Sequence, residues 1–213
     1  TEGMKKSSNH PVSQKISLPE ISIIVSARNE ELNLPVLIKS LVSQNYPKDL
    51  LKIIIVNDRS TDNTHKILKK FKDQYNNIKI ITITETPEDW APKKWALNSA
   101  VKESNTDIIL QTDADCVPNK NWVRTAVQYF SKPSVGFISG PAPLTIDNNT
   151  LLNSLFKLDS LSQDAFSAGG FSRGLVFSCT GRNMGFLKQA FEDVGGYSNI
   201  SNFISGDDDL LLQ

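Results

Sequence analysis

The sequence predicts a single α/β domain with a mostly parallel central sheet and flanking helices. Short apolar runs rich in β-branched residues alternate with segments of helical periodicity, at a spacing typical of βαβ units. Asp, Asn or Glu residues follow several of these runs, as expected where the strands of a parallel sheet end in a ligand site. With 213 residues, 39% of them hydrophobic, the chain is long enough to bury one sizeable core.

Four apolar runs, at 21–25, 53–56, 78–83 and 108–110, are predicted to be buried strands. A helical pattern follows each run, and its apolar positions are Leu34, Leu37, Ile38 and Leu41, then Ile67, Leu68, Phe71 and Tyr75, then Leu97, Ala100 and Val101, and finally Trp122, Val123, Ala126, Val127 and Phe130. We expect Asn29 to cap the first helix and Ser60-Thr61-Asp62 to cap the second.

The alternation weakens beyond residue 131. The pattern there predicts a strand over 135–143, an amphipathic helix over 150–168 that Gly169-Gly170 breaks, a strand over 177–180, and a short helix over 186–194 that ends at Gly195-Gly196. We expect this half to extend the same sheet. The polar, aperiodic residues 1–19 predict a disordered lead-in, and residues 209–213 resemble the first turn of a helix in a longer protein.

The composition excludes several classes of function. The 23 Lys and Arg balance 23 Asp and Glu, whereas a nucleic-acid partner requires clustered positive charge. Two Cys and two His are too few for a disulfide scaffold or a Cys- or His-based metal site, and they argue against a Ser-His-Asp hydrolase. No apolar run is long enough to span a bilayer. Carboxylates are therefore the side chains best placed to carry chemistry.

The polar segments are expected to converge at one edge of the sheet. Right-handed crossovers favour the strand order 3-2-1-4, in which the loops after the first and fourth strands flank the point where α/β sheets bind ligands. This order places Ala27–Glu30 beside Asp113–Asp115, with Asp58 next to them.

Asp113 and Asp115, in Thr112-Asp113-Ala114-Asp115, are candidate metal ligands. Two carboxylates at positions i and i+2 can bind one Mg²⁺ or Mn²⁺ ion, which commonly shares its oxygen ligands with substrate phosphates. The alternative is a polar loop with a capping Asp. A phosphatase of the haloacid dehalogenase type is disfavoured, because its Asp-x-Asp follows the first strand and here that strand ends in Ser26-Ala27-Arg28-Asn29.

A second acidic segment is Gly206-Asp207-Asp208-Asp209. Three adjacent carboxylates repel one another, so the pKa of at least one should rise, which suits a general base. The alternative is a helix start whose acidic residues face the positive end of the helix dipole.

Taken in order, these segments resemble the inverting nucleotide-sugar glycosyltransferases of family 2, which have the GT-A fold. The matching segments are Ser26–Glu31, Val56–Thr64, Lys93–Asn98, Thr112–Asp115, Thr180–Asn183 and Gly206–Asp209. The resemblance covers residues 20 to 213 and implies a catalytic domain there. Its nucleotide-binding half would span about 20–116 and its acceptor half about 117–213.

The resemblance also implies a role for each matching residue. Ala27, Arg28, Glu30 and Asp58 would hold the base and ribose of the donor, and Lys93 would lie near the donor. Asp113 and Asp115 would bind the metal, and with Ala114 they would contact the donor diphosphate. Asp208 would be the general base, with Asp207 as the alternative, and the acceptor would lie near Trp90, Gly181, Arg182 and Asn183. Structural roles compete with these, since Glu30 and Asp58 suit turns or helix starts and Lys93 and Lys94 suit a solvated first turn.

The implied cofactor is Mn²⁺ or Mg²⁺. The implied partners are a nucleoside-diphosphate sugar donor and a lipid or saccharide acceptor, with no nucleic acid. Membrane association, at the cytoplasmic side and in the synthesis of cell-envelope glycoconjugates, would depend on segments outside this chain. The alternatives are an inactive nucleotide-binding module of the same fold, and a nucleotidyltransferase, whose Gly-rich loop after the first strand is absent from residues 26–31.

Overall fold

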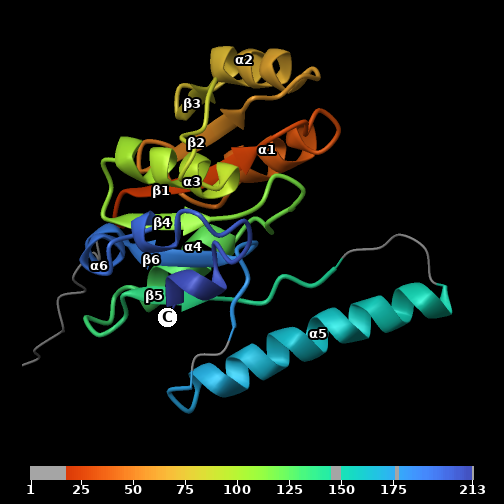
Figure 1. The fold of residues 1–213 in the computed structure, drawn as a ribbon, viewed down its shortest axis with the longest axis vertical. Coiled ribbons are helices and arrows are strands. Elements are labelled where there is room, and N and C mark those ends of the chain that lie inside the picture. The colour runs from red at the N-terminus through yellow and green to blue at the C-terminus, as the bar shows by residue number, and fades with distance from the viewer. Residues whose placement is uncertain (1–17, 145–149, 176–177, 213) are drawn as a thin grey trace, which may run out of the picture.

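The structure, a computed structural model, describes residues 18–144, 150–175 and 178–212. A six-stranded sheet lies between two layers of helices (Figure 1). The predicted α/β class with a mostly parallel sheet is confirmed. Of the lead-in predicted over 1–19, all but Leu18 and Pro19 lies outside the described residues.

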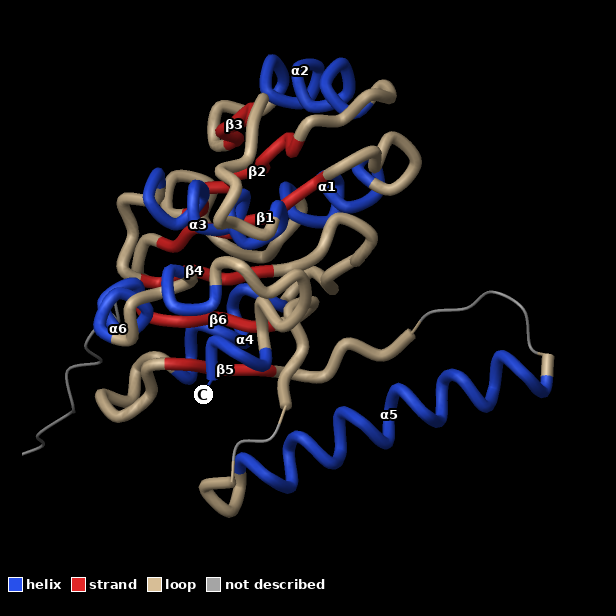
Figure 2. Tube along the Cα trace, in the orientation of Figure 1, coloured by secondary structure: helices blue, strands red, loops and turns tan. Residues whose placement is uncertain are grey.

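The strand order is β3-β2-β1-β4-β6-β5. The strands are β1 (Ile21–Ala27), β2 (Leu51–Asp58), β3 (Ile78–Ile83), β4 (Ile108–Gln111), β5 (Phe137–Ser139) and β6 (Met184–Leu187). The first four are parallel, which confirms the predicted order 3-2-1-4, while β6 is antiparallel to both β4 and β5. The second half of the chain therefore extends the same sheet (Figure 2).

Two hydrophobic clusters fill the space between the sheet and its helices. The helices are α1 (Leu34–Val42), α2 (Thr64–Gln74), α3 (Pro92–Glu103), α4 (Trp122–Tyr129), α5 (Leu151–Phe171) and α6 (Lys188–Asp193), followed by the 3₁₀ turns η1 (Ser198–Ile200) and η2 (Asp209–Leu212). One cluster joins α1, α2 and α4 to the sheet, and the other joins α3 and α6 to its opposite face. Because both faces are covered, β1 is buried along nearly its whole length, as is typical of a parallel sheet.

Several predicted boundaries are wrong. Asn29 does not cap the first helix, because α1 begins at Leu34 and Asn29 adopts a left-handed backbone with φ of 57°. Gly169-Gly170 does not break α5, which runs to Phe171. Each Gly costs a helix only about 1 kcal/mol relative to Ala, so the other residues of this long helix can offset the cost of both.

The predicted strand over 177–180 is also absent where the structure describes it. Residues 178–180 form no regular element, and Phe177 lies outside the described residues. The strand of this region is β6, which includes Phe186, so the following helix begins later than predicted, at Lys188. The positive φ values of Gly195 and Gly196, 82° and 55°, end that helix as expected.

Helix α5 lies outside the two helix layers, beyond the β5 edge of the sheet (Figure 1). Its Asp164 Oδ2 accepts a hydrogen bond from the Ala142 amide at 3.3 Å. Along its length only Ser160 and Gly170 are buried. Among the described residues, no helix is both long and apolar enough to cross a bilayer.

The junction of β4 and β6 leaves no room for a side chain at Gly185. A Cβ there would lie 2.5 Å from Leu110 Cδ2 and 3.2 Å from the Ile109 carbonyl oxygen. We expect Gly185→Ala to lower the free energy of unfolding by about 1–3 kcal/mol, because the buried neighbours must shift.

Gly169→Ala is the matched control, since its Cβ would meet no atom within 4 Å. It should leave stability unchanged or raise it by up to about 1 kcal/mol through helix propensity. Chemical denaturation of both variants measures the difference, and equal effects would contradict the close packing of β6 on β4.

Candidate functional site

The loops after β1 and β2 are tied together at the carboxyl edge of the sheet. The Asn29 amide donates to Ser60 Oγ at 3.0 Å, and Asn29 Oδ1 accepts from the Thr61 amide at 2.7 Å. The Glu30 amide donates to Thr64 Oγ1 at 2.8 Å. Several polar residues of both segments therefore hold the two loops to each other, a structural role that the sequence did not distinguish from ligand binding.

Asp62 belongs to the same contact. Its Oδ1 accepts from the amide of Thr64, the first residue of α2, at 2.9 Å, and its Oδ2 accepts from the Glu31 amide at 3.1 Å. The N-cap position of α2 is Asn63, so the predicted cap lies one residue too early. These hydrogen bonds lower the pKa of its carboxyl against the opposing effect of burial.

The predicted nucleotide-binding residues surround this pair of loops. Asp58 is 2% exposed at the end of β2. Arg59 donates two hydrogen bonds to its carboxylate, from Nε to Oδ1 at 2.7 Å and from Nη2 to Oδ2 at 3.2 Å. Ala27 is buried at the end of β1, and Arg28 beside it is exposed. Glu30 is partly exposed and accepts a hydrogen bond from Asn33 Nδ2 at 2.7 Å.

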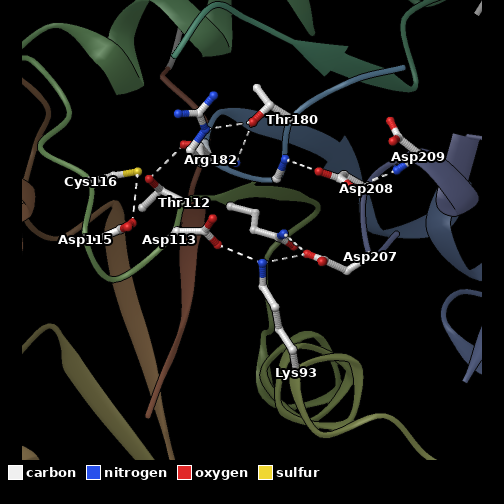
Figure 3. A network of polar contacts seen from close by, with 12 residues as sticks. Lys93, Thr112, Asp113, Asp115, Cys116, Thr180, Arg182, Asp207, Asp208 and Asp209 are labelled. Carbon is white, nitrogen blue, oxygen red and sulfur yellow. Dashed lines mark hydrogen bonds and ion pairs between the residues drawn. The ribbon is translucent and has the colours of Figure 1, made fainter. Parts of the chain in front are cut away.

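Lys93, in the first turn of α3, joins the two acidic segments. Its Nζ lies 3.0 Å from Asp113 Oδ1 and 3.1 Å from Asp207 Oδ2 (Figure 3). One ammonium group therefore bridges the loop after β4 and the loop before η2. The two segments were identified separately in the sequence, and the structure brings them together through this lysine.

Buried polar groups extend the bridge into the second hydrophobic cluster. Gln111, the last residue of β4, donates from Nε2 to Asp207 Oδ2 at 3.4 Å and accepts from the Tyr197 hydroxyl at 3.1 Å. Gln111 and Tyr197 are both 0% exposed. Sequence reasoning missed these two residues. A glutamine at the end of an apolar strand, two residues before the first Asp of Asp-x-Asp, was the one available signal.

The network shifts two pKa values in the same direction. Burial raises the pKa of the Asp207 carboxyl, and although Lys93 opposes this effect, Asp208 and Asp113 add to it. Burial lowers the pKa of Lys93, but the attraction of Asp113 and Asp207 outweighs burial and places that pKa above its ordinary value. The expected rise in an acidic pKa is therefore found at Asp207.

Asp208 points the other way, toward the segment 180–183. Its Oδ2 accepts from the Gly181 amide at 2.8 Å, and its Oδ1 accepts from the Asp209 amide at 2.9 Å. Asp209 Oδ1 in turn accepts from the Cys179 amide at 2.8 Å. Figure 3 shows the Asp207 side chain directed toward Lys93 and the Asp208 side chain directed toward the segment that carries Thr180 and Arg182.

Asp208 and Asp209 line a cavity of about 800 Å³. Its other described walls come from α4, β5, α5 and the segment 178–183, and they include the aromatic residues Trp122, Tyr129, Phe137 and Phe171. Aromatic walls with a few convergent polar groups are typical of sites for organic ligands. The cavity joins the acidic loop to the second half of the chain.

The predicted acceptor residues divide between this cavity and other contacts. Arg182 and Asn183 line it, and Asn183 Oδ1 accepts from Trp122 Nε1 at 2.8 Å. Gly181 contributes its amide to Asp208, and a Cβ at Gly181 would lie 3.1 Å from Asp207 Oδ2. Trp90 instead packs edge-to-face on Trp95, with ring centroids 5.2 Å apart, and is not among the described residues of the cavity wall.

The Asp113 and Asp115 carboxylates fit a hard divalent cation in their chemistry. Both are oxygen donors in one turn, and Asp115 is exposed while Asp113 is partly exposed. Mg²⁺ and Mn²⁺ are commonly bound by one or two carboxylates, with the remaining positions filled by water and substrate phosphates. Among the described residues, no group of three or more His, Cys, Asp or Glu is arranged to hold a metal ion.

Comparison with known proteins places this chain in a family. The profile of the family described as Glycosyl transferase family 2 matches residues 22–195. The probable glycosyltransferase YdaM of Bacillus subtilis is 32% identical over 184 residues, which are 85% of this chain and 44% of YdaM. The glycosyltransferase AglE of Haloferax volcanii is 27% identical over 90% of this chain and 60% of AglE. This chain thus spans about half the length of these relatives.

Solved structures show the same fold. The mannosyltransferase PcManGT from Pyrobaculum calidifontis, in complex with GDP-Man and Mn²⁺, superimposes with a TM-score of 0.67 at 22% identity, over 91% of this chain and 50% of that protein. Staphylococcus aureus TarS gives a TM-score of 0.64 at 21% identity, over 90% of this chain and 32% of TarS.

Replacing Lys93 with Met tests the bridge. The variant should lose about 1–2 kcal/mol of unfolding free energy at pH 7, a modest value because the Lys93 side chain is 40% exposed. Since its pKa is raised, the contribution of Lys93 is complete below the ordinary lysine pKa and is lost as pH rises through the raised value.

The loss should also shrink as pH falls into the acidic range through the raised pKa of Asp207, because that carboxylate then takes up a proton and no longer requires a cation. Chemical denaturation across pH measures both effects. Lys70→Met, on the exposed side of α2, should change stability by less than about 0.5 kcal/mol. A pH-independent loss at Lys93 would rule out the bridge as its cause.

Proposed function

This chain belongs to glycosyl transferase family 2, and we propose that it transfers a sugar from a nucleoside-diphosphate donor to an acceptor hydroxyl group, with inversion at the anomeric carbon. The observation that carries the proposal is the Lys93 bridge. It places Asp113 of the Asp-x-Asp turn and Asp207 on one ammonium group, with Asp208 beside them at the cavity wall. Metal-diphosphate ligands and a general base have to meet at such a point for group transfer.

The donor nucleoside is proposed to occupy the edge formed by the loops after β1 and β2. Asp58, buried at the end of β2, would accept hydrogen bonds from the base or ribose, with Ala27, Arg28 and Glu30 around it. Its carboxylate is held by Arg59 here, so a nucleoside has to share Asp58 with that guanidinium or displace it. The exposed Arg28 is free of that constraint and suits a flexible contact.

The diphosphate is proposed to lie at the Asp-x-Asp turn. Asp113 and Asp115 would hold Mn²⁺ or Mg²⁺ there, and the cation would offset the charge of the departing nucleoside diphosphate. The Lys93 ammonium, 3.0 Å from Asp113 Oδ1, supplies a second positive charge at the same point. Ala114, which is 4% exposed, fills the position between the two carboxylates without competing for either.

Asp208 is proposed to act as the general base. Its carboxylate lines the cavity, and the amides of Gly181 and Asp209 fix its orientation. The acceptor hydroxyl would give its proton to Asp208 while its oxygen attacks the anomeric carbon opposite the leaving diphosphate, which inverts that carbon. Asp207 is less suited to this step because it is already engaged with Lys93 and Gln111.

The cavity is proposed to hold the acceptor. Its aromatic walls suit a sugar face or an alkyl chain, and Arg182 and Asn183 supply polar contacts. A relative that is 27% identical over 93% of this chain is the β-monoglucosyldiacylglycerol synthase of Synechocystis, whose name supports a lipid acceptor, with a saccharide as the alternative. We place such transfer at the cytoplasmic side of a membrane. Trp90 would contribute only if its loop moves from Trp95.

Asp115→Ala tests the metal assignment. UDP or GDP should raise the midpoint of thermal unfolding more in Mn²⁺ than in chelator, because ligand binding stabilises the folded state. The substitution should abolish that difference by deleting an oxygen ligand. Asp73→Ala, on the exposed side of α2, should preserve it. A variant at 115 that keeps the full Mn²⁺-dependent shift would refute the assignment.

Asp208→Asn tests the proposed reaction itself. It preserves size but cannot accept the proton, so kcat at saturating donor should fall roughly 10²- to 10⁴-fold while affinity for UDP or GDP changes little. Asp207→Asn should lose less. If Asp207→Asn loses more than Asp208→Asn, the base is Asp207. If neither loses activity, this acidic loop does not supply the base.

A further inference from the structure

Lys94 is a buried lysine that the proposed chemistry does not use. Its side chain is 1% exposed, and its Nζ donates to the carbonyl oxygens of Phe203 at 2.6 Å and Ser205 at 2.7 Å. Removing an ammonium group from water is costly unless hydrogen bonds replace its hydration. The two hydrogen bonds offset this cost, and they also fix the backbone of residues 203–205.

That backbone leads directly into the acidic loop. Residues 201–208 lie outside every helix and strand, and Gly206 turns the chain with φ of 76° immediately before Asp207 and Asp208. The two apolar side chains of the loop do little to anchor it, because Phe203 is 54% exposed and Ile204 is 90% exposed. Besides the contacts of Gln111 and the Gly181 amide with its carboxylates, the loop is held by contacts from the start of α3.

Three neighbouring residues at the start of α3 contact this loop. The Ala91 amide donates to the Ser201 carbonyl at 2.6 Å, Lys93 binds the Asp207 carboxylate, and Lys94 binds the two carbonyls between them. Lys93 thus binds a side chain of the loop, and Lys94 binds its backbone. The reading of both lysines as a solvated first turn is therefore wrong.

We propose that Lys94 is a positioning residue for glycosyl transfer, which fixes the loop 203–208 so that the Asp208 carboxylate keeps its place against the Gly181 amide and the cavity. This inference rests on the role proposed for Asp208. The first turn of α3 would then fix the position of Asp208 relative to the donor site, because the same turn also binds Asp113 through Lys93.

Lys94→Met tests the proposal, because it retains the length of the side chain and removes both hydrogen bonds. In the full-length protein, kcat should fall about 10- to 100-fold, since displacement of a reacting group by about 1 Å can cost 10²-fold. The donor KM and the affinity for UDP or GDP with Mn²⁺ should stay within about twofold, because the proposed nucleoside contacts lie on the loops after β1 and β2. Retained nucleotide binding also shows that the variant is folded.

Hydrogen exchange supplies a readout that is independent of transfer. Amides of residues 203–209 and of Gly181 should exchange faster in Lys94→Met, while those of β1, β2 and β4 should not. Lys94→Gln, whose amide group can still donate to a carbonyl, should recover part of both the rate and the protection. Lys70→Met serves as the exposed control and should change neither.

The outcomes separate the two proposals. The positioning role would be overturned by any of three results in Lys94→Met. These are an unchanged kcat, an equal loss of donor affinity and kcat, and unaltered hydrogen exchange at residues 203–209. If Asp208→Asn keeps full activity, the proposed base is wrong, and the positioning role that rests on it is overturned with it. The positioning role is supported if Lys94→Met shows both faster exchange in the loop and a lower kcat, and if Lys94→Gln partly restores both.

Discussion

Placing several carboxylates at one edge of a sheet requires positive charge among them, and the Lys93 ammonium supplies it. It lies within 3.1 Å of both Asp113 and Asp207, which belong to loops far apart in the sequence. Without a cation between them, Asp207 would be a buried charge beside like charges, and the loop that carries Asp208 would be pushed away from the Asp-x-Asp turn. The relative position of the proposed diphosphate and acceptor sites depends on this contact.

The parallel sheet determines what Lys93 can reach. The loops after β1, β2 and β4 meet at one edge because these strands are parallel and adjacent. Helix α3 follows the parallel strand β3, so its first turn begins at that same edge. Hydrogen bonds between residues 29–31 and 60–64 then fix the first two loops to each other. The sheet determines which loops meet at this edge, and polar contacts between the loops fix their relative positions.

The acidic loop gives its first two carboxylates different environments. Asp207 is held by Lys93 and by the buried Gln111, which also contacts Tyr197, so its position is tied to the core. Asp208 is oriented by the backbone amides of Gly181 and Asp209 and lines the cavity. A fixed carboxylate beside an accessible one is an arrangement in which neighbours in sequence can serve structure and chemistry separately.

The sequence by itself determined the α/β class, the order of the first four strands and the location of the acidic segments, because hydrophobic periodicity and crossover handedness are local or general properties. It gave Asn29 the wrong role, left the role of Lys94 open, missed Gln111 and Tyr197, and placed the strand after α5 incorrectly. Only the tertiary structure decided these, since β6 is a four-residue run defined by its antiparallel pairing with β4, and Lys94 is defined by carbonyls more than a hundred residues away. Such contacts leave no periodic trace in the chain, because they depend on which distant backbone atoms the fold brings within hydrogen-bonding distance.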